Sequence, residues 1–577
     1  MPVHNATIAD VFDEIADLLE LTNANAFRVR AYRRAAQTVR GNSQELWQDV
    51  EAGRDLERLP GIGADLAGKI AEIVKTRTCA LLTQLRARVS PGQAELLRLP
   101  GVGPKRVRQL KLRHGITTAA QLRAALAAGK PIGVPGLATA TGTRLAAALE
   151  HRGAPVRTLR SVAAPIAAAL VAHLKPVRGV AEAIVAGSFR RGRETVGDLD
   201  LLVSSEDPAP AIEAFCSFDE VSDVVARGRT RAAVLLASGL AVDLRVVPAA
   251  GFGAALHYFT GNKSHNIHVR RLAQRAGLKL NEYGLFRGKR RTGGATEEEV
   301  FAAVGLPWIA PELREDRGEI EAAREGRLPQ LVTRADLKGD LHVHTDWSDG
   351  GAPLAEMVAA ARRAGLSYVG ISDHSKYLGA THGLDAAALA RQGEAIDALA
   401  VRGIGVLKGV EVDILEDGSL ALPDEVLARL DYVIGAVHGH FDLDERRQTE
   451  RLLRALDHPH LTILAHPRGR LINERPPMEF DLGAVLERAR ARGAFLELNC
   501  QPTRLDLSDA ECALARQHGV RIAVGSDAHA TDGFALLEPG LLQARRGGLA
   551  AGDVLNTLPL AKLRAAIAAR PATARRR

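Results

Sequence analysis

The segment AIVAGSFRRGRETVGDLDLLV, residues 183–203, decides how the middle of this chain folds. Its two apolar runs, Ala183–Ala186 and Leu199–Val203, predict strands separated by a glycine-containing turn. Asp198 and Asp200 lie two residues apart, so their carboxylates point to the same face of the second strand. The segment therefore predicts a mixed α/β unit with two acids aimed at one point.

A third acid extends this pattern. Asp243 lies in another predicted strand, Val242–Val247, which would bring its carboxylate beside Asp198 and Asp200. Three crowded carboxylates repel one another unless cations hold them, and Mg²⁺ prefers such oxygen ligands. Two ions would stabilise the attacking and leaving oxygens of an in-line phosphoryl transfer. Surface acids at alternate strand positions are the alternative interpretation.

Several short motifs surround the acids in a regular order. They are Gly187-Ser188-Phe189-Arg190-Arg191-Gly192, Gly197-Asp198-Leu199-Asp200 and Tyr258-Phe259-Thr260-Gly261, followed by Asn266 and Arg270. Their order and spacing closely resemble the DNA polymerase X family, to which DNA polymerase beta belongs, over about residues 5–315. The resemblance implies a nucleotidyltransferase palm, a thumb-like subdomain and template-directed DNA synthesis.

The resemblance also implies a role for each matching residue. Asp198, Asp200 and Asp243 would bind catalytic Mg²⁺, and Ser188 and Arg191 would hold the incoming triphosphate. The resemblance also places Gly187, Gly197 and Gly261 in the nucleotide site. Tyr258 and Phe259 would line the sugar pocket, Asn266 would contact the base and Arg270 would contact the template. Asn262 departs from the serine usual in the family, and we expect it to tune nucleotide binding.

The first 150 residues predict helices, at Ile8–Leu21, Ala26–Val39 and Ala64–Lys75, broken by Pro-Gly pairs. Two segments repeat, Leu59–Gly63 and Leu99–Gly103, each before a basic helix. Glycines there expose backbone N–H groups that attract phosphate. The segments resemble helix-hairpin-helix motifs, with DNA contacts expected at Gly61, Gly63, Gly101, Gly103 and Lys105. Tight interhelical turns are the alternative, and a third copy at 134–138 lacks the second glycine.

Lys69 is a separate candidate in this front region. Phe27–Ala36 and the first hairpin resemble the family's small domain that binds 5′ ends. Lys69 then matches the lysine that forms a Schiff base with a 5′-deoxyribose phosphate in family members with lyase activity, for which it must be neutral. A phosphate-binding lysine is the alternative, and Asp65 stands where a basic residue is common.

The C-terminal half predicts repeated βα units, plausible as a barrel, with His, Asp and Glu residues at the strand ends. Mixed imidazole and carboxylate ligands suit Zn²⁺, Mn²⁺ or Fe²⁺ better than Mg²⁺. Structural histidines are the alternative, which nine recurrences make hard to sustain. The candidate metal ligands are His342, His344, Asp349, His374, Glu411, His438, His466, Asp527 and His529.

These nine residues match the metal positions of the PHP (polymerase and histidinol phosphatase) family, over about residues 336–570. That resemblance implies a distorted βα barrel with three ions, Mn²⁺ or Zn²⁺. It groups His342, His344, Glu411 and Asp527 at one ion, Glu411, His438 and His466 at the second, and Asp349, His374 and His529 at the third.

The bulk properties agree with a globular, multidomain DNA enzyme. With 577 residues the chain exceeds one core, and no apolar run approaches a membrane span. Its beginning carries acids where a signal peptide needs a basic end and an apolar run, which predicts a cytoplasmic protein, and the expected DNA substrate places it at the nucleoid. The four cysteines are far apart, which indicates reduced thiols. A net charge of +8 is compatible with nucleic acid but weak support alone.

Six segments are expected. They are a 5′-end-binding domain (1–90), a fingers-like subdomain (91–155), the palm (156–250), the thumb-like subdomain (251–317), a linker (318–335) and the PHP domain (336–577).

An X-type polymerase joined to a PHP domain is the domain order of bacterial X-family polymerases. We therefore expect a monomeric gap-filling polymerase with 3′–5′ exonuclease or 3′-end phosphoesterase activity, and abasic-site cleavage is a further activity associated with such proteins. Its partners would be gapped or nicked DNA and dNTPs. The alternatives are a DNA-binding protein whose one active enzyme is the PHP phosphoesterase, and a scaffold for DNA ends.

Overall fold

The computed structural model divides the chain into two compact units. Unit 1 comprises Met1–Pro155 with Asn473–Pro476, and unit 2 comprises Val156–Ile472 with Pro477–Arg577. The structure describes residues 3, 5–22, 24–40, 46–59, 61–90, 92–93, 96, 104–127, 157–376, 382–399 and 401–570. Each unit is considered separately below.

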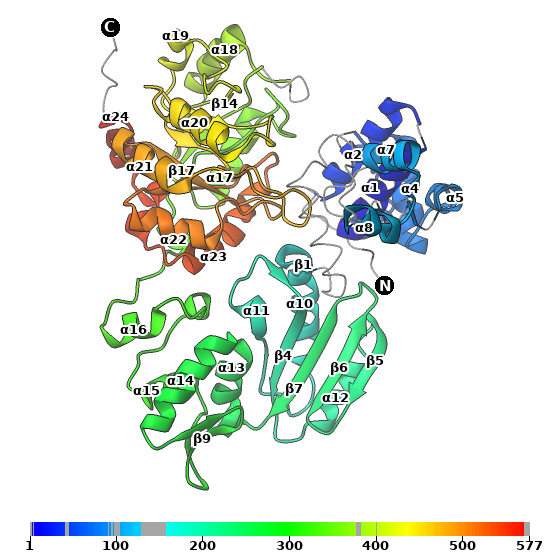
Figure 1. Ribbon diagram of the computed structural model, residues 1–577, viewed down its shortest axis with the longest axis vertical. Helices are drawn as coiled ribbons and strands as arrows, with labels where there is room; N and C mark the ends of the chain where they lie inside the picture. The colour runs from blue at the N-terminus through cyan, green and yellow to red at the C-terminus, as the bar shows by residue number, and fades with distance from the viewer. Residues whose placement is uncertain are drawn as a thin grey trace. The chain divides into compact units, whose positions relative to one another are not determined.

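Unit 1 is helical (Figure 1). Apolar residues at three-to-four spacing, such as Phe12 and Ile15, meet Tyr32 and Ile70 in a buried core. The predicted helices are present, with ends within a few residues of those expected. Gly101, Gly103 and residues 134–138 lie outside the described residues. The helices are α1 (Asn5–Leu21), α2 (Ala26–Arg40), α3 (Leu46–Glu51), α4 (Ala64–Thr76), α5 (Ala80–Arg88), α7 (Pro104–His114) and α8 (Ala119–Ala127).

Unit 2 begins with a five-stranded sheet in the order β2-β4-β7-β6-β5, and helices α10 and α12 pack against its apolar core (Figure 1). Strands β4 and β7 are parallel, and the other pairs are antiparallel. Edge strand β5 was not predicted, because its side chains are almost all exposed and lack apolar alternation. The elements are β1 (Thr158–Leu159), α10 (Arg160–Leu174), β2 (Glu182–Val185), α11 (Gly187–Arg190), β3 (Thr195–Val196), β4 (Asp198–Ser204), α12 (Ala209–Cys216), β5 (Val221–Arg227), β6 (Arg231–Leu236) and β7 (Ala241–Val247).

A smaller helical layer with a three-stranded antiparallel sheet follows. The side chain of Asn262 caps its second helix by accepting the His265 N–H at 2.8 Å. The segment expected as a linker, 318–335, contains a short helix at Glu319–Arg324, after Gly318 at φ +93°. The elements are α13 (Phe252–Thr260), α14 (Lys263–Arg275), β8 (Lys279–Asn281), β9 (Gly284–Arg287), β10 (Arg290–Gly293), α15 (Glu297–Ala302) and α16 (Glu319–Arg324).

The C-terminal part alternates strands and helices as predicted. Its strands are β11 (Gly339–Asp340), β12 (Tyr368–Ile371), β13 (Gly405–Lys408), β14 (Glu411–Asp413), β15 (Ile434–Ala436), β16 (Ile463–Leu464), β17 (Phe495–Asn499) and β18 (Ile522–Gly525). Its helices are α17 (Leu354–Arg363), α18 (Ala386–Asp397), α19 (Asp424–Leu427), α20 (Glu445–Leu456), α21 (Leu482–Arg492), α22 (Asp509–Gln517), α23 (Leu537–Arg546) and α24 (Leu560–Ala568).

These strands form two parallel sheets, β11-β12-β13 and β14-β15-β16-β17-β18. The sheets are separated at Gly409 and Val410, between β13 and β14, and the Tyr432 ring lies so close to Gly409 that a Cβ there would clash with it. Isolated parallel bridges, Val343 to Ala528 and His374 to Glu411, link the ends of the two sheets without a continuous ladder. None of the helices in the described ranges is both long and apolar enough to cross a bilayer.

Candidate active sites

The strand register of the first sheet brings the three predicted acids to one face. Asp200 on β4 is paired directly with Asp243 on β7, and Asp198 precedes Asp200 by two residues on the same strand. Arg231 on β6 donates to Asp243 at 2.9 Å. The three acids therefore lie on neighbouring parallel strands, as their alternation suggested.

The electrostatics of this face favour a bound cation. Burial raises the pKa of Asp200, and the charges of Asp198 and Asp243 raise it further, to about 7. A carboxylate that resists ionisation beside two other acids is stabilised by a cation among them. Because all three acids offer oxygen atoms as ligands, this face is suitable for a hard divalent ion.

The turn before β4 approaches Asp200 closely. Gly187 has φ +62°, and a Cβ there would clash with the Asp200 carboxylate. The Ala186 N–H donates to the Asp200 carbonyl oxygen at 2.7 Å. Ser188 follows on α11, and Gly197 directly precedes β4. The predicted nucleotide-binding turn thus lies against the acidic face.

The two arginines of this turn are held differently. Arg190 donates to both carboxylate oxygens of Glu297 at 2.8 Å, whereas Arg191 donates to the Thr260 carbonyl at 2.6 Å and to Glu315 at 3.1 Å. Both arginines thereby tie the turn to the layer that follows β7. Sequence reasoning did not identify Glu297 or Glu315, because neither belongs to a motif.

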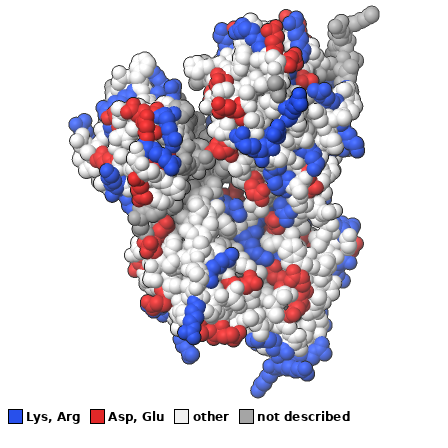
Figure 2. All heavy atoms as spheres, turned by 180° about the vertical axis from the view of Figure 1, so that it is seen from behind, with Lys and Arg blue, Asp and Glu red and all other residues white. Residues whose placement is uncertain are grey.

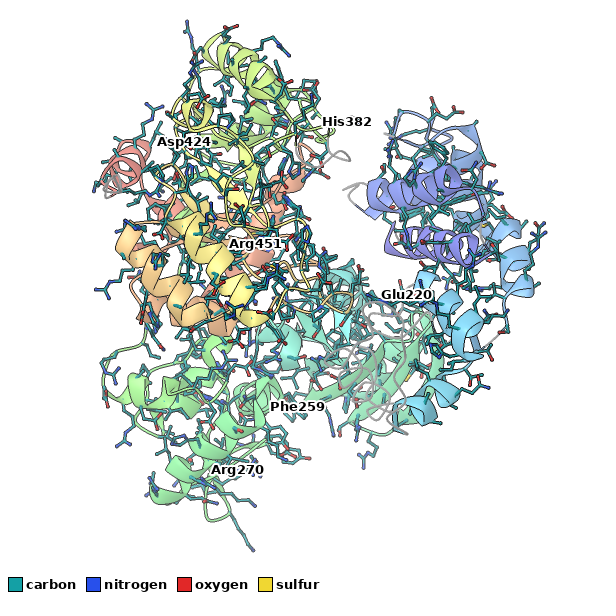
Figure 3. The ribbon with its side chains drawn as sticks, turned by 45° about the horizontal axis from the view of Figure 1, so that its top comes forward. Glu220, Phe259, Arg270, His382, Asp424 and Arg451 are labelled. Atoms are coloured by element: carbon teal, nitrogen blue, oxygen red, sulfur yellow. The ribbon has the colours of Figure 1, made fainter. Side chains whose placement is uncertain are left out.

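The remaining predicted nucleotide contacts come from α13 and α14. The Asn266 amide donates to the Tyr258 carbonyl at 2.7 Å, and Tyr258 and Phe259 meet edge to face. Tyr258 and Arg270 line one cavity together with Lys279 and Glu282. Figure 3 labels Phe259 on α13 and Arg270 on α14. Gly261, with φ +71°, joins the two helices.

The first glycine hairpin in unit 1 precedes α4. Gly61 has φ +73°, and Gly63 caps the helix without a side-chain hydrogen bond. Both glycines are exposed, so the N–H groups at this end of α4 face outward. Lys105 lies in α7, and its side chain is outside the described part. On the face in Figure 2, basic and acidic side chains are interspersed instead of forming one basic patch.

Lys69 lies one turn into α4 and forms an ion pair with Asp65. Burial lowers the pKa of Lys69, but its hydrogen bond to the Asp65 carboxylate and the nearby Tyr32 outweigh burial, and the pKa is raised. The raised pKa disfavours the neutral amine. Asp65, the departure noted in the sequence, thus contributes with Tyr32 to raising the pKa of Lys69.

The nine candidate ligands of the C-terminal part gather at one end of its strands. Most follow a strand by a few residues, as predicted, whereas Glu411 is the first residue of β14. Three overlapping groups have ligand atoms within 4.8 Å of one another: His344, Asp349, His374 and His529; His342, His344 and Asp527; and His374, Glu411 and His438.

These groups differ from the expected ones, and Glu411 is absent from the group that contains His342. His344 belongs to two groups, and His374 joins Glu411 and His438. His466 enters none of the three groups, although its Nε2 is 2.9 Å from Glu411. Glu411 also lies 3.2 Å from His438 and 2.9 Å from His374, and it is therefore the shared centre of the cluster.

The buried ring nitrogens fit metal ions. His342 Nε2, His344 Nδ1 and Nε2, and His374 Nδ1 have no hydrogen-bond partner among the described residues, although carboxylates lie within 4 Å. An unsatisfied buried nitrogen is costly unless something else binds it. Burial raises the pKa of Glu411, but His374, His342 and His438 outweigh it and hold the pKa well below its ordinary value. The cluster thus offers divalent ions an ionised carboxylate and buried ring nitrogens that no described residue hydrogen-bonds.

Sequence reasoning missed the carboxylates that orient these ligands. Glu497 on β17 accepts from His342 Nδ1 at 2.6 Å and from the His466 backbone N–H at 2.8 Å. Asp413 accepts from His438 Nδ1 at 2.9 Å. Such partners fix the ring orientation of a metal-binding histidine. Strand alternation could have indicated both, since Asp413 is two residues from Glu411 and Glu497 is a lone acid in an apolar strand.

The backbone is strained at two of the ligands. His466 has φ +26° and Asp527 has φ +53°, both in the left-handed region. Non-glycine residues in this region cost free energy and cluster at functional sites. The side chain of Asn499 stabilises the Asp527 side chain by donating a hydrogen bond to its carboxylate at 3.0 Å.

Comparison with known proteins agrees with this arrangement. The chain matches family profiles for a helix-hairpin-helix domain (3–79), a SAM-like helix-hairpin-helix tandem (94–151), the DNA polymerase beta palm (157–242) and thumb (255–315), and a PHP domain (340–492). These matches correspond to the helical front, the two central layers and the strand-rich C-terminal part.

Similar proteins match either the whole chain or its end. The DNA polymerase/3′-5′ exonuclease PolX of Bacillus subtilis (strain 168) is 35% identical over 566 residues, covering 97% of this chain and 98% of that protein. A probable phosphatase of Thermoanaerobacter sp. (strain X514) is 33% identical over 231 residues, covering 38% of this chain and 89% of that protein. Because the Bacillus protein aligns over nearly the full length of both chains, this chain belongs to the PolX family of DNA polymerases, which joins a polymerase beta-like core to a PHP domain.

Proposed function

We propose that this protein fills short gaps in DNA by template-directed synthesis and processes 3′ ends with its PHP domain, in base-excision and gap repair. The observation that carries the proposal is the pairing of Asp200 with Asp243, beside the close turn at Gly187. An acidic face next to a nucleotide-binding turn suits phosphoryl transfer. A protein that merely held DNA ends for other enzymes would not need this arrangement.

In the polymerase core, Asp198, Asp200 and Asp243 would hold Mg²⁺. Bound there, the ions would supply charge stabilisation to the attacking 3′-oxygen and the leaving pyrophosphate. Ser188 and Arg191 would bind the triphosphate, with Gly187 and Gly197 allowing its close approach. Tyr258, Phe259 and Gly261 would bound the sugar pocket, Asn266 would contact the base, and Arg270 the template.

In the PHP domain, the nine ligands would hold up to three Mn²⁺ or Zn²⁺ ions. Such ions activate water and neutralise a leaving oxygen. Glu411 would bridge ions, and Glu497 and Asp413 would hold His342 and His438 in the correct ring orientation. We propose 3′–5′ exonuclease or 3′-end phosphoesterase activity here, with abasic-site cleavage as a further reaction of the same chemistry.

The substrates would be gapped or nicked DNA and dNTPs. Gly61 and Gly63, and by repetition Gly101, Gly103 and Lys105, would hold the DNA backbone through phosphate contacts that carry no sequence preference. We further propose a monomer that works in the cytoplasm at the nucleoid, since its substrate is chromosomal DNA.

One labelled, 5′-phosphorylated gapped duplex tests the proposal. We expect primer extension with dNTPs and Mg²⁺, and primer shortening with Mn²⁺ in the absence of dNTPs. Shortening without any extension would instead favour the alternative in which the PHP phosphoesterase is the one active enzyme, an outcome to which the phosphatase relatives give weight. If the primer is neither extended nor shortened, the result would favour the alternative that the protein is a scaffold for DNA ends.

Lyase activity should be weak at neutral pH and controlled by Asp65. Because Asp65 helps raise the pKa of Lys69, the reactive neutral amine is scarce at pH 7. Its fraction grows about tenfold for each unit by which the pH is raised, until the pH reaches that pKa. Asp65→Asn should therefore increase borohydride trapping on an abasic 5′ end several-fold at pH 7.5. Lys69→Ala should remove trapping, and Lys75→Ala, at the end of the same helix, should not. If trapping is unchanged in Lys69→Ala, Lys69 is not the Schiff-base lysine, and the alternative that it binds phosphate is favoured.

A further inference from the structure

Helix α23 of the PHP domain packs on the nucleotide-binding turn of the polymerase core. Gly192 closes this turn with φ +70°, and a Cβ there would lie 3.5 Å from Leu542 and 3.6 Å from Arg546. Nearby, Arg470 forms an ion pair with Glu194 at 2.6 Å. The turn that would receive the triphosphate is thus supported by side chains from the other catalytic domain.

Arg546 makes the central contacts. Its guanidinium donates to the Arg191 carbonyl oxygen at 2.7 Å, to Glu315 Oε1 at 2.9 Å and to Asp509 at 2.7 Å. The Arg546 side chain is 2% exposed. A buried guanidinium with three acceptors is a rigid anchor, because leaving any of its donors unsatisfied is costly.

Glu315 connects Arg546 to the guanidinium of Arg191. The same Oε1 that accepts from Arg546 accepts Arg191 Nε at 3.1 Å, and Oε2 accepts the Asn262 amide at 3.1 Å. Asn262 caps α14 with its oxygen while its nitrogen binds Glu315, so its departure from the family's serine joins the helix cap to this cluster.

The shared carboxylate determines how strongly Arg191 is held. With two arginines on one oxygen, Glu315 divides its attraction between them. Arg193 is also 3.8 Å from the other oxygen of Glu315, but it is 40% exposed, so solvent weakens its attraction. Without Arg546, the charge of Glu315 would therefore act mainly on Arg191, in a site where both side chains are nearly buried. Arg191 would then be drawn to Glu315 and less available to a triphosphate.

We infer that Arg546 of the PHP domain is a positioning residue for DNA synthesis, which sets how Arg191 is presented to the incoming nucleotide. The inference rests on the proposed role of Arg191 in triphosphate binding. It makes the PHP domain part of the polymerase's nucleotide site, independently of PHP catalysis.

Steady-state filling of a single-nucleotide gap tests this inference. Arg546→Gln should raise the KM for dNTP at least about tenfold with little change in kcat, since Arg546 acts on binding. Arg545→Gln is the matched control: Arg545 is adjacent on α23 and pairs with Glu312 at 2.8 Å, and its KM should change less than about twofold. Exonuclease rates should not change in either variant.

Rescue distinguishes positioning from a general structural role. Glu315→Gln in the Arg546→Gln background removes the unbalanced charge and should restore KM to within about threefold of the wild-type value. Arg546→Lys, a milder change, should raise KM less than Arg546→Gln. An unaltered KM in Arg546→Gln, a failure of Glu315→Gln to rescue, or an equal loss of exonuclease activity would overturn the inference.

An Arg191→Ala variant separates this inference from the proposed function. If Arg191→Ala does not raise the KM for dNTP, the proposed role of Arg191 is wrong. If it does, while Arg546→Gln behaves as wild type, the role of Arg191 stands and the inference about α23 fails.

Discussion

Asp200→Asn should abolish nucleotide incorporation and leave 3′-end degradation unchanged. Asparagine keeps the shape of the side chain but removes the negative charge that would hold Mg²⁺ opposite Asp243. We expect the rate of gap filling to fall by at least about 10³-fold, equivalent to about 4 kcal/mol of transition-state stabilisation. Single-nucleotide insertion with Mg²⁺ and end degradation with Mn²⁺ should be measured on the same preparation.

This substitution should not weaken the fold. Ionisation of Asp200 costs stability because its folded-state pKa is about 7 against an ordinary 3.8. That cost is absent below pH 3.8, grows as pH rises and is complete above about pH 7. In metal-free buffer at pH 8, Asp200→Asn should therefore melt at the same temperature as the wild type or higher.

Asp223→Asn provides the matched control, because Asp223 is an exposed acid on edge strand β5 of the same sheet. Incorporation by this control should equal that of the wild type. Persistent incorporation in Asp200→Asn would show that the triad is misassigned. Simultaneous loss of both reactions would show that the two sites are not independent.

Glu411→Gln should have the opposite effect and stop end degradation while sparing synthesis. Glu411 lies among His342, His374, His438 and His466, so the amide removes the one charge that these ligands share. We expect end degradation to fall at least about 10³-fold. The number of Mn²⁺ ions bound per chain, measured by titration calorimetry, should also fall.

The control for this variant is Glu487→Gln, an exposed glutamate on α21. His342→Ala combined with His344→Ala is a second test of the same cluster and should give the same separation of activities. End degradation that survives both variants would place the phosphoesterase site elsewhere. Loss of gap filling in Glu411→Gln would mean that the PHP ions support the polymerase fold.

The fold class was predictable because it depends on local periodicity. Apolar spacing predicted α1, α2 and α4 of unit 1, and short apolar runs predicted β2, β4 and β7. The failure at β5 has a local cause too, because this strand is exposed on nearly every residue, whereas the contact of Gly409 with Tyr432 joins residues that are distant in the sequence. Neither feature leaves a signal in the surrounding sequence.

The candidate ligands were predictable for a related reason. A strand repeats every two residues, so Asp198 and Asp200 had to share a face, and histidines beside acids after apolar runs had to lie at strand ends. The chemistry of the side chains then indicated divalent ions. Their distribution among ions was less predictable, as the positions of His344, His374 and His466 show.

The sequence by itself determined the identity of the chemical groups and the face on which each lies, because rotamer direction and strand period act within a few residues. The tertiary structure alone decided that β7 lies beside β4, which histidine each of Glu497 and Asp413 orients, and that Arg546 reaches Arg191. These contacts join segments far apart in the chain, and their formation depends on how whole layers pack, which no local pattern encodes.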